Sequence, residues 1–263
     1  MRSKIIAVNA GIVTVIAILT YVLLQTSLKD VVANPVERKK EVAQALRAAS
    51  SQLALDALRL ERWLEHSASN ESTRNVLGLG TPEARSEAAT AEANRLRDAA
   101  IGEPMFAKMA PSLVLFVDAQ GVAVGRNGSA LMRGEQVAKD YPSLNEAIKT
   151  GTTGSAIWIN KQRQEQMLAS FAPLRSETGA VVGAIVIGTA LSDERLTRTS
   201  ELTSGQTLMF ALVDDKNMSV LADSAATPEE LSSAADPTVV AAARQAISSG
   251  SVTSADNVLQ DRL

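Results

Sequence analysis

The chain lacks cysteine altogether, and it has one histidine, His66, and few aromatic residues, which make up 3% of its 263 residues. Without cysteine the protein has no disulfide, no thiolate metal site and no cysteine nucleophile. A single histidine excludes metal sites and proton relays that need several histidines. The formal net charge of −3 argues against a general nucleic-acid binder, because such a protein needs a concentrated basic face to displace counterions from phosphates. We therefore expect no metal, no cofactor and no nucleic-acid partner.

Catalytic motifs are missing as well. The sequence has no GxSxG elbow, no GxxxxGK loop, no GxGxxG turn and no HExxH helix, and no arrangement places a nucleophile beside its base. The chain is nevertheless 46% hydrophobic, which is too apolar for a disordered tail and enough to fill one or two cores. The composition favours a folded protein that is not an enzyme.

The first part of the chain is apolar. No residue from Ile5 to Leu24 is charged, and this run matches the roughly 20 residues that a helix needs to cross a bilayer. We interpret it as a transmembrane helix that anchors the protein in the inner membrane as a single span. Because Arg2 and Lys4 precede it, residues 1–4 are predicted to stay in the cytoplasm and the bulk of the chain to be periplasmic.

A cleaved signal peptide is the competing interpretation, because small residues that a signal peptidase prefers occur at Val31–Ala33. The apolar run is longer than the roughly 7–15 residues of a signal-peptide core, and it ends well before Ala33. An uncleaved anchor is therefore favoured.

Residues 25–111 are predicted to form a juxtamembrane helical region. A helix is expected from Val36 to about His66, because neither glycine nor proline interrupts it. Apolar residues recur along this helix at heptad spacing, namely Leu46, Leu53 and Leu60, with Val42, Ala57 and Leu64 on the adjoining positions. Two hypotheses stay open for this seam. It joins two copies in a homodimer and carries a rotation or piston movement to the bilayer, or it packs on its own domain.

A polar break at residues 70–80 follows the long helix. Thr81 and Pro82 are then predicted to open another helix that runs to about Ala100, with Thr81 as its cap and Pro82 in its first turn.

The periodicity changes at Ser112, where a first sheet unit over residues 112–191 is predicted to begin. A helix is expected from Pro142, with a capping box of Ser143 and Glu146, and it ends at Gly151. Strand-like apolar runs cover residues 113–117, 122–124, 154–160, 167–174 and 180–190. The pattern predicts a five-stranded antiparallel sheet with helices on one side, an α+β arrangement.

Residues 192–263 repeat part of this pattern. After a helix expected at 192–202, the hairpin that contains Val213-Asp214 mirrors the one that contains Val117-Asp118. A helix capped by Asp236-Pro237 then mirrors the helix that ends at Gly151. The counterparts of the last three strands are missing, and a half-built sheet would leave strand edges unpaired. We infer an incomplete second unit, which belongs to a longer protein or is completed by a partner chain.

Three passages carry a recognisable pattern. The hairpin from Leu115 to Val124 has the sequence apolar-Asp-x-x-Gly-apolar, and the stretch from Ala169 to Gly188 has an apolar strand, Ala172-Pro173, a turn and a Gly-x-x-x-Gly strand. The long helix is the third passage. Together, over about residues 36–263, they resemble the Cache superfamily of extracytoplasmic sensor domains in a double arrangement. These domains are relatives of PAS domains and occur in bacterial chemoreceptors and sensor kinases.

The resemblance implies PAS-like units that hold a small ligand between a sheet face and the helix that crosses it. The candidate ligand-binding residues of the first unit are Phe116, Arg126, Tyr141, Trp158, Arg163, Phe171 and Arg175. Trp158 is expected to stack on a ligand or to donate from its indole, and its alternative is an ordinary core residue. Arg126 is expected to clamp a carboxylate, and its alternative is a solvated surface arginine.

Two functions from different classes fit these features. The first is the sensory input module of a membrane-anchored bacterial receptor, in which a small ligand or a periplasmic partner biases the juxtamembrane helix. The second is an anchored envelope scaffold that binds no small molecule. A pocket lined by polar groups in residues 112–190 favours the sensor, and a sheet face sealed by aliphatic side chains favours the scaffold.

Overall fold

The computed structural model describes residues 35–78, 80–129, 132–160, 165–203, 208–212, 218–223 and 237–249. The chain divides into two compact units, residues 1–46 and 47–263. The helices are α2 (Pro35–Ser69), α3 (Glu71–Arg74), α4 (Pro82–Gly102), α5 (Val137–Asp140), α6 (Pro142–Thr150), α7 (Asp193–Thr203) and α9 (Pro237–Ser249), with 3₁₀ turns η1 (Asn75–Gly78) and η2 (Pro104–Phe106). The strands are β1 (Pro111–Asp118), β2 (Ala123–Arg126), β3 (Gly154–Asn160), β4 (Glu165–Arg175), β5 (Val181–Ala190), β6 (Leu208–Leu212) and β7 (Met218–Asp223).

A five-stranded sheet forms the centre of the fold. Its strand order is β2-β1-β5-β4-β3, and each neighbouring pair is antiparallel. In the register of the central pair, Val114 lies opposite Ile187 and Phe116 opposite Ile185. The predicted α+β class and the five-stranded antiparallel sheet are therefore confirmed.

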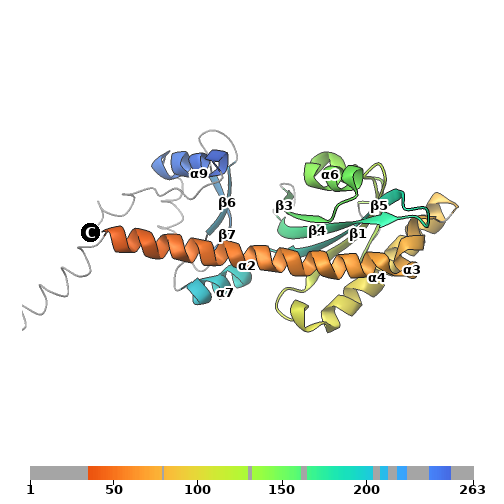
Figure 1. Cartoon of the computed structure of the whole chain (residues 1–263), viewed down its shortest axis with the longest axis horizontal. Coiled ribbons are helices and arrows are strands. Elements are labelled where there is room, and N and C mark those ends of the chain that lie inside the picture. Colours follow the sequence, from red (N-terminus) through yellow and green to blue (C-terminus); the bar gives the residue numbers. More distant parts are fainter. Residues whose placement is uncertain are drawn as a thin grey trace, which may run out of the picture. The chain divides into compact units, whose positions relative to one another are not determined.

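Helices cover both faces of this sheet, so the expectation of helices on one side is wrong. α2 and α4 pack on one face, where Leu60 and Leu96 meet Phe116 in a common core. α5 and α6 pack on the other face, where Leu144 and Leu115 belong to a second core. Figure 1 shows α6 and the long helix α2 on opposite sides of the sheet. The reason lies in β1, whose residues 113–117 are all buried. A strand with apolar side chains on both faces needs a cover on each of them.

The long helix α2 contributes to the first of these cores. Leu60 and Leu64 are fully buried, and Leu53 and Ala57 are partly buried against the same core. Leu46, earlier on the same seam, is 48% exposed. The C-terminal half of the predicted heptad seam thus packs on its own domain, which was one of the two hypotheses, and homodimerisation stays a prediction.

Local signals placed most helix ends correctly. The Thr81 hydroxyl accepts a hydrogen bond from the Ala84 amide at 3.2 Å, and Pro82 opens α4 as predicted. Gly151 ends α6 in the left-handed conformation, at φ 67°. The Ser143–Glu146 capping box is wrong, because α6 has Tyr141 at its N-cap with no side-chain cap bond and Ser143 lies inside the first turn.

The predicted polar break after α2 is also wrong in part. Residues 71–78 form α3 and η1, and Val76 and Leu77 of η1 are buried in the core. Two apolar side chains in a polar stretch were enough to bring this connection onto the sheet.

The second sheet unit is not confirmed. The described residues of 208–223 form a two-stranded antiparallel sheet of β6 and β7, and α9 begins at Pro237 as expected. The predicted hairpin turn and Asp214 lie outside the described residues, as does the apolar run from Ile5 to Leu24. Within the part of the chain that the structure describes, no helix has the length and apolarity to span a bilayer. The predicted domain boundaries, at residues 1–4, 5–24, 25–111, 112–191 and 192–263, stay predictions.

Candidate functional site

An aromatic pair occupies the sheet face that α5 and α6 cover. Trp158 projects from β3, and Tyr141 lies between α5 and α6. The two rings stack with their centroids 3.9 Å apart and their planes 6° from parallel. Phe171 of β4 is buried on the same face, where its ring lies against Gly154. The structure therefore brings together three of the predicted site residues, Tyr141, Trp158 and Phe171.

The indole of Trp158 has an unusual environment. Its side chain is buried, with 2% relative exposure, and within the described residues its Nε1 has no hydrogen-bond partner. A buried N–H without a partner costs about 1–3 kcal/mol, and nearly all buried polar groups in folded proteins find one. Burial of this donor beside the Tyr141 ring makes this part of the sheet the strongest candidate for a ligand contact.

Arg126 lies at the end of β2, on the same sheet face. It pairs with Leu115, whose side chain faces α6. Its Nε donates to the Asn127 carbonyl at 3.3 Å, and its Nη1 lies 3.5 Å from the Met132 sulfur. Met132 packs against the same core as Tyr141 and has a left-handed backbone, at φ 72°. The guanidinium is thus held beside the aromatic side of the sheet by a strained loop residue.

Two other predicted residues lie elsewhere. Phe116 is fully buried on the opposite face, in the core with α2 and α4. Arg175 is exposed and bridges two turns, because its Nη2 donates to the Gly151 carbonyl at 2.7 Å and its Nη1 to the Gly179 carbonyl at 3.0 Å. Arg163 lies outside the described residues.

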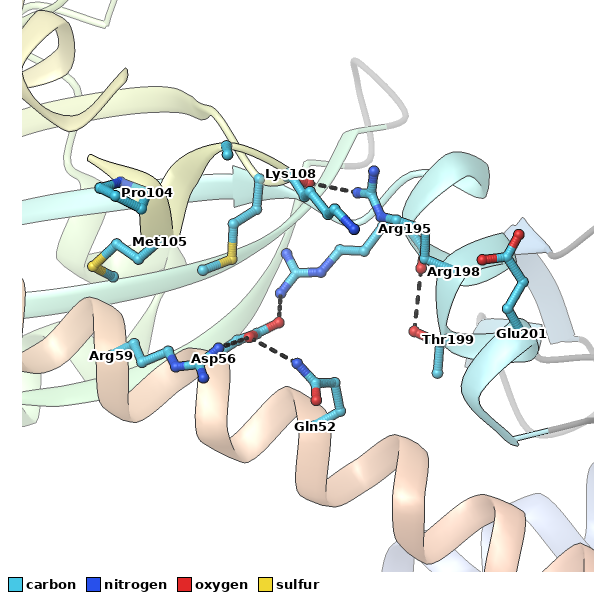
Figure 2. A pocket seen from close by; sticks show the side chains of 12 residues that line it. Gln52, Asp56, Arg59, Pro104, Met105, Lys108, Arg195, Arg198, Thr199 and Glu201 are labelled. Atoms are coloured by element: carbon cyan, nitrogen blue, oxygen red, sulfur yellow. Dashed lines mark hydrogen bonds and ion pairs between the residues drawn. The ribbon is translucent and has the colours of Figure 1, made fainter. Parts of the chain in front are cut away.

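A second candidate site, which the sequence did not indicate, is a cleft at the α2–α7 side of the fold, with both polar and apolar walls. Its volume is about 600 Å³. Its walls come from α2, from the segment around η2 and from α7, through Gln52, Asp56, Arg59, Pro104, Met105, Ala107, Lys108, Met109, Arg195, Arg198, Thr199 and Glu201. We call it the α2–α7 cleft. Figure 2 shows Arg195 extending toward α2 to meet Asp56.

The ion pair of Asp56 and Arg195 closes one wall of this cleft. Arg195 Nη2 lies 2.7 Å from Asp56 Oδ2, and the two side chains are only 9% and 10% exposed. The Gln52 amide donates to the other carboxylate oxygen at 3.1 Å, and Arg195 Nη1 donates to the Thr189 hydroxyl at 3.0 Å. The pair therefore fastens the long helix to α7 and to the end of β5. Its members are 139 residues apart, so no local pattern pointed to it.

A separate buried carboxylate ties α3 to α4. Glu92 accepts hydrogen bonds from the Thr73 hydroxyl at 2.6 Å and from Arg95, whose guanidinium lies 2.7 Å away. These hydrogen bonds, the one from Arg95 above all, hold the pKa of Glu92 below its ordinary value, although burial opposes the shift. Both carboxylate oxygens of Glu92 accept hydrogen bonds from neighbouring side chains of the fold. Within the described residues, no group of three or more metal-ligating side chains lies together.

The chain matches no protein-family model and no curated protein sequence. Several solved structures resemble it. The sensor domain of the histidine kinase DctB from V. cholerae is 12% identical, with a TM-score of 0.49 over 74% of this chain and 67% of that one. The ligand-binding domain of the Campylobacter jejuni chemoreceptor Tlp3, in complex with L-valine, is 14% identical, with a TM-score of 0.48 over 86% and 82%. The E. coli DcuS sensor domain is 18% identical, with a TM-score of 0.43 over 57% and 97%.

These neighbours are sensor and ligand-binding domains of kinases and chemoreceptors, the kind of protein that the Cache resemblance named. Likenesses with TM-scores under 0.5 transfer neither a ligand nor a binding residue to this chain. Its function has to follow from its own side chains.

Proposed function

We propose that the chain is the sensory input module of a membrane-anchored receptor, and that its aromatic sheet face binds a small molecule. The observation that carries the proposal is the buried Trp158 Nε1, which has no partner within the described residues. A ligand acceptor atom at this donor would supply the missing hydrogen bond, and a flat or apolar ligand part would replace or extend the Tyr141 stack.

Arg126 supports an anionic or carbonyl-bearing ligand. Its Nε donates to the Asn127 carbonyl and its Nη1 to the Met132 sulfur, and both of these acceptors are neutral. A carboxylate makes shorter and stronger bonds to a guanidinium than these neutral acceptors do. A carboxylate at this face would therefore compete with the Met132 sulfur for the Arg126 guanidinium.

The signal would pass through the sheet to α2. Leu115 of β1 faces the proposed site, and its neighbours Val114 and Phe116 pack with Leu60 and Leu64 of α2 on the other face. A shift of β1 on binding would change the packing of the long helix. Since α2 follows the apolar run from Ile5 to Leu24, this shift would be passed toward the membrane.

The scaffold without a ligand is the second candidate, and one observation favours it. The face under α6 is filled by aliphatic side chains, among them Leu115, Leu144 and Ile148, which are all buried. In a scaffold, the Trp158–Tyr141 stack would serve packing alone.

The test uses the fluorescence of Trp158 in the full chain in detergent. Because the chain has two tryptophans, W63F leaves Trp158 as the sole emitter. We expect at least one compound of a panel of amino acids and small carboxylates to raise the melting temperature and to change the Trp158 emission with the same saturation curve. W158F should weaken that compound's binding by tenfold or more, because it removes the donor. A panel without any saturable change in either signal would favour the scaffold.

A further inference from the structure

The α2–α7 cleft is positively charged, whereas the whole chain carries a formal net charge of −3. Four basic and two acidic side chains line it, namely Arg59, Lys108, Arg195, Arg198, Asp56 and Glu201. A cleft with low-dielectric walls concentrates the field of the charges that line it, so that anions gather there. The local excess of positive charge is a property of this cleft rather than of the protein.

Two of the basic groups are available to a ligand. Asp56 already has its charge balanced by Arg195 at 2.7 Å. Arg59 reaches Asp56 only at 3.7 Å and is 49% exposed. Within the described part of the chain, the Lys108 ammonium makes no hydrogen bond and no ion pair. Its carbonyl accepts from Arg198, as Figure 2 shows, and this bond holds the Lys108 backbone at the cleft.

The remaining wall of the cleft is apolar. Met105 and Met109 are half-buried, and Met105 packs against the core that α2 shares with the sheet. Methionine adapts its shape to an irregular apolar partner. A volume of about 600 Å³ lies within the usual range of small-molecule sites.

We propose that the α2–α7 cleft binds a small organic carboxylate, at a site separate from the aromatic sheet face. Lys108 and Arg59 would hold the carboxylate, and Arg59 would donate two parallel hydrogen bonds to its two oxygens. The methionines would contact the carbon chain. Such a ligand touches α2 and α7 at once and adds to the Asp56–Arg195 connection between them. It would therefore stabilise this arrangement of the long helix by mass action.

The experiment is calorimetric titration of the full chain in detergent with succinate, with butyrate and with sulfate, at one ionic strength set with chloride. We expect saturable binding of succinate or butyrate and none of sulfate, which offers the methionines no carbon chain. K108E should weaken the binding tenfold or more, and R59E should do the same. Matched controls are K139E on α5 and R62E on α2, since Lys139 and Arg62 are exposed and do not line the cleft.

The outcomes separate this site from the aromatic one. W158F should leave the carboxylate affinity unchanged, whereas loss of binding in W158F would assign the ligand to the sheet face and overturn the proposal. No saturable heat with either carboxylate, or equal weakening by the control variants, would also overturn it. If sulfate bound as tightly as succinate, with the same loss in K108E, the site would be one for small inorganic anions and the carboxylate assignment would fall. Where a variant's unfolding curve shows a folding defect, K108A and R59A replace the charge reversals.

Discussion

Glu92 gives the clearest case in which a single residue couples stability to pH. The Arg95, Thr73 and Ser72 hydrogen bonds favour its charged form, so its folded-state pKa lies below the ordinary 4.5. A carboxyl with a depressed folded pKa contributes stability in full above its unfolded pKa, and this contribution is lost as the pH falls through the folded value. The fold should therefore lose stability in acid partly through this one side chain.

We expect E92Q to lower the free energy of unfolding by about 1.5–3 kcal/mol at pH 7, because it removes charged hydrogen bonds in a buried place. The deficit should shrink as the pH falls below 4.5, because the carboxyl of the unfolded wild type then takes up a proton. At a pH below the folded pKa the folded carboxyl is neutral too, like the glutamine amide. Urea unfolding of both proteins at pH 7 and at pH 3 measures this. E87Q, which changes an exposed residue of α4, is the control and should have little effect. A deficit that is the same at both pH values would contradict the assignment.

For single residues, the sequence predicted the sheet face of some side chains but not the groups that they contact. Trp158 and Phe171 came out on one sheet face because alternation along a strand fixes the face of each residue. Phe116 was assigned to the site although it lies on the other face, since a strand buried on both sides gives no alternation from which the face can be chosen. Arg175 was predicted as a site residue at the end of a strand, but its Nη1 and Nη2 donate to the carbonyls of two turns.

Among elements, the buried ion pair of Asp56 and Arg195 connects α2 to α7. Replacing one member of such a pair leaves the other charge buried without a partner, which costs about 3–5 kcal/mol. D56N should therefore destabilise the protein by several kcal/mol, and it should also increase hydrogen exchange of the α7 amides, because Arg195 lies in α7.

The matched control is R59Q. Arg59 pairs with the same carboxylate, but at 3.7 Å and from an exposed position, and such pairs are worth less than about 1 kcal/mol. Urea unfolding and hydrogen exchange compare the two variants directly. If D56N were no more destabilised than R59Q, the buried pair would not hold α7 to the long helix.

Element boundaries were predictable where one residue decides them. Thr81, Pro82 and Gly151 act through local backbone geometry, and the structure confirms each of them. The cover of the second sheet face and the α2–α7 cleft depend on contacts between residues far apart in the chain, such as Asp56 and Arg195. Periodicity and spacing carry no information on such contacts, so this candidate site could not be found before the structure.

On the scale of the whole molecule, the described residues give one complete sheet unit with a long helix, which follows the apolar run at Ile5–Leu24 in the sequence. The predicted homodimer would bring two copies of this helix together. Leu60 and Leu64 are not available for that contact, because they are buried against their own sheet. If the heptad seam joins two copies, it does so through its N-terminal part, where Leu46 is 48% exposed.

The absence of cysteine makes this prediction simple to test, because L46C introduces the only thiol. We expect mild oxidation of membranes that contain L46C to give a disulfide-linked dimer on a non-reducing gel. L58C is the matched control, since Leu58 is on the same helix and 54% exposed. At about 100° per residue, it points away from the seam of Leu46, Leu53 and Leu60. Strong cross-linking at L46C with little at L58C would place the seam between two copies, because parallel helices in register bring identical seam residues together. Equal yields at both positions, or none at L46C, would mean that α2 serves its own domain along its whole length.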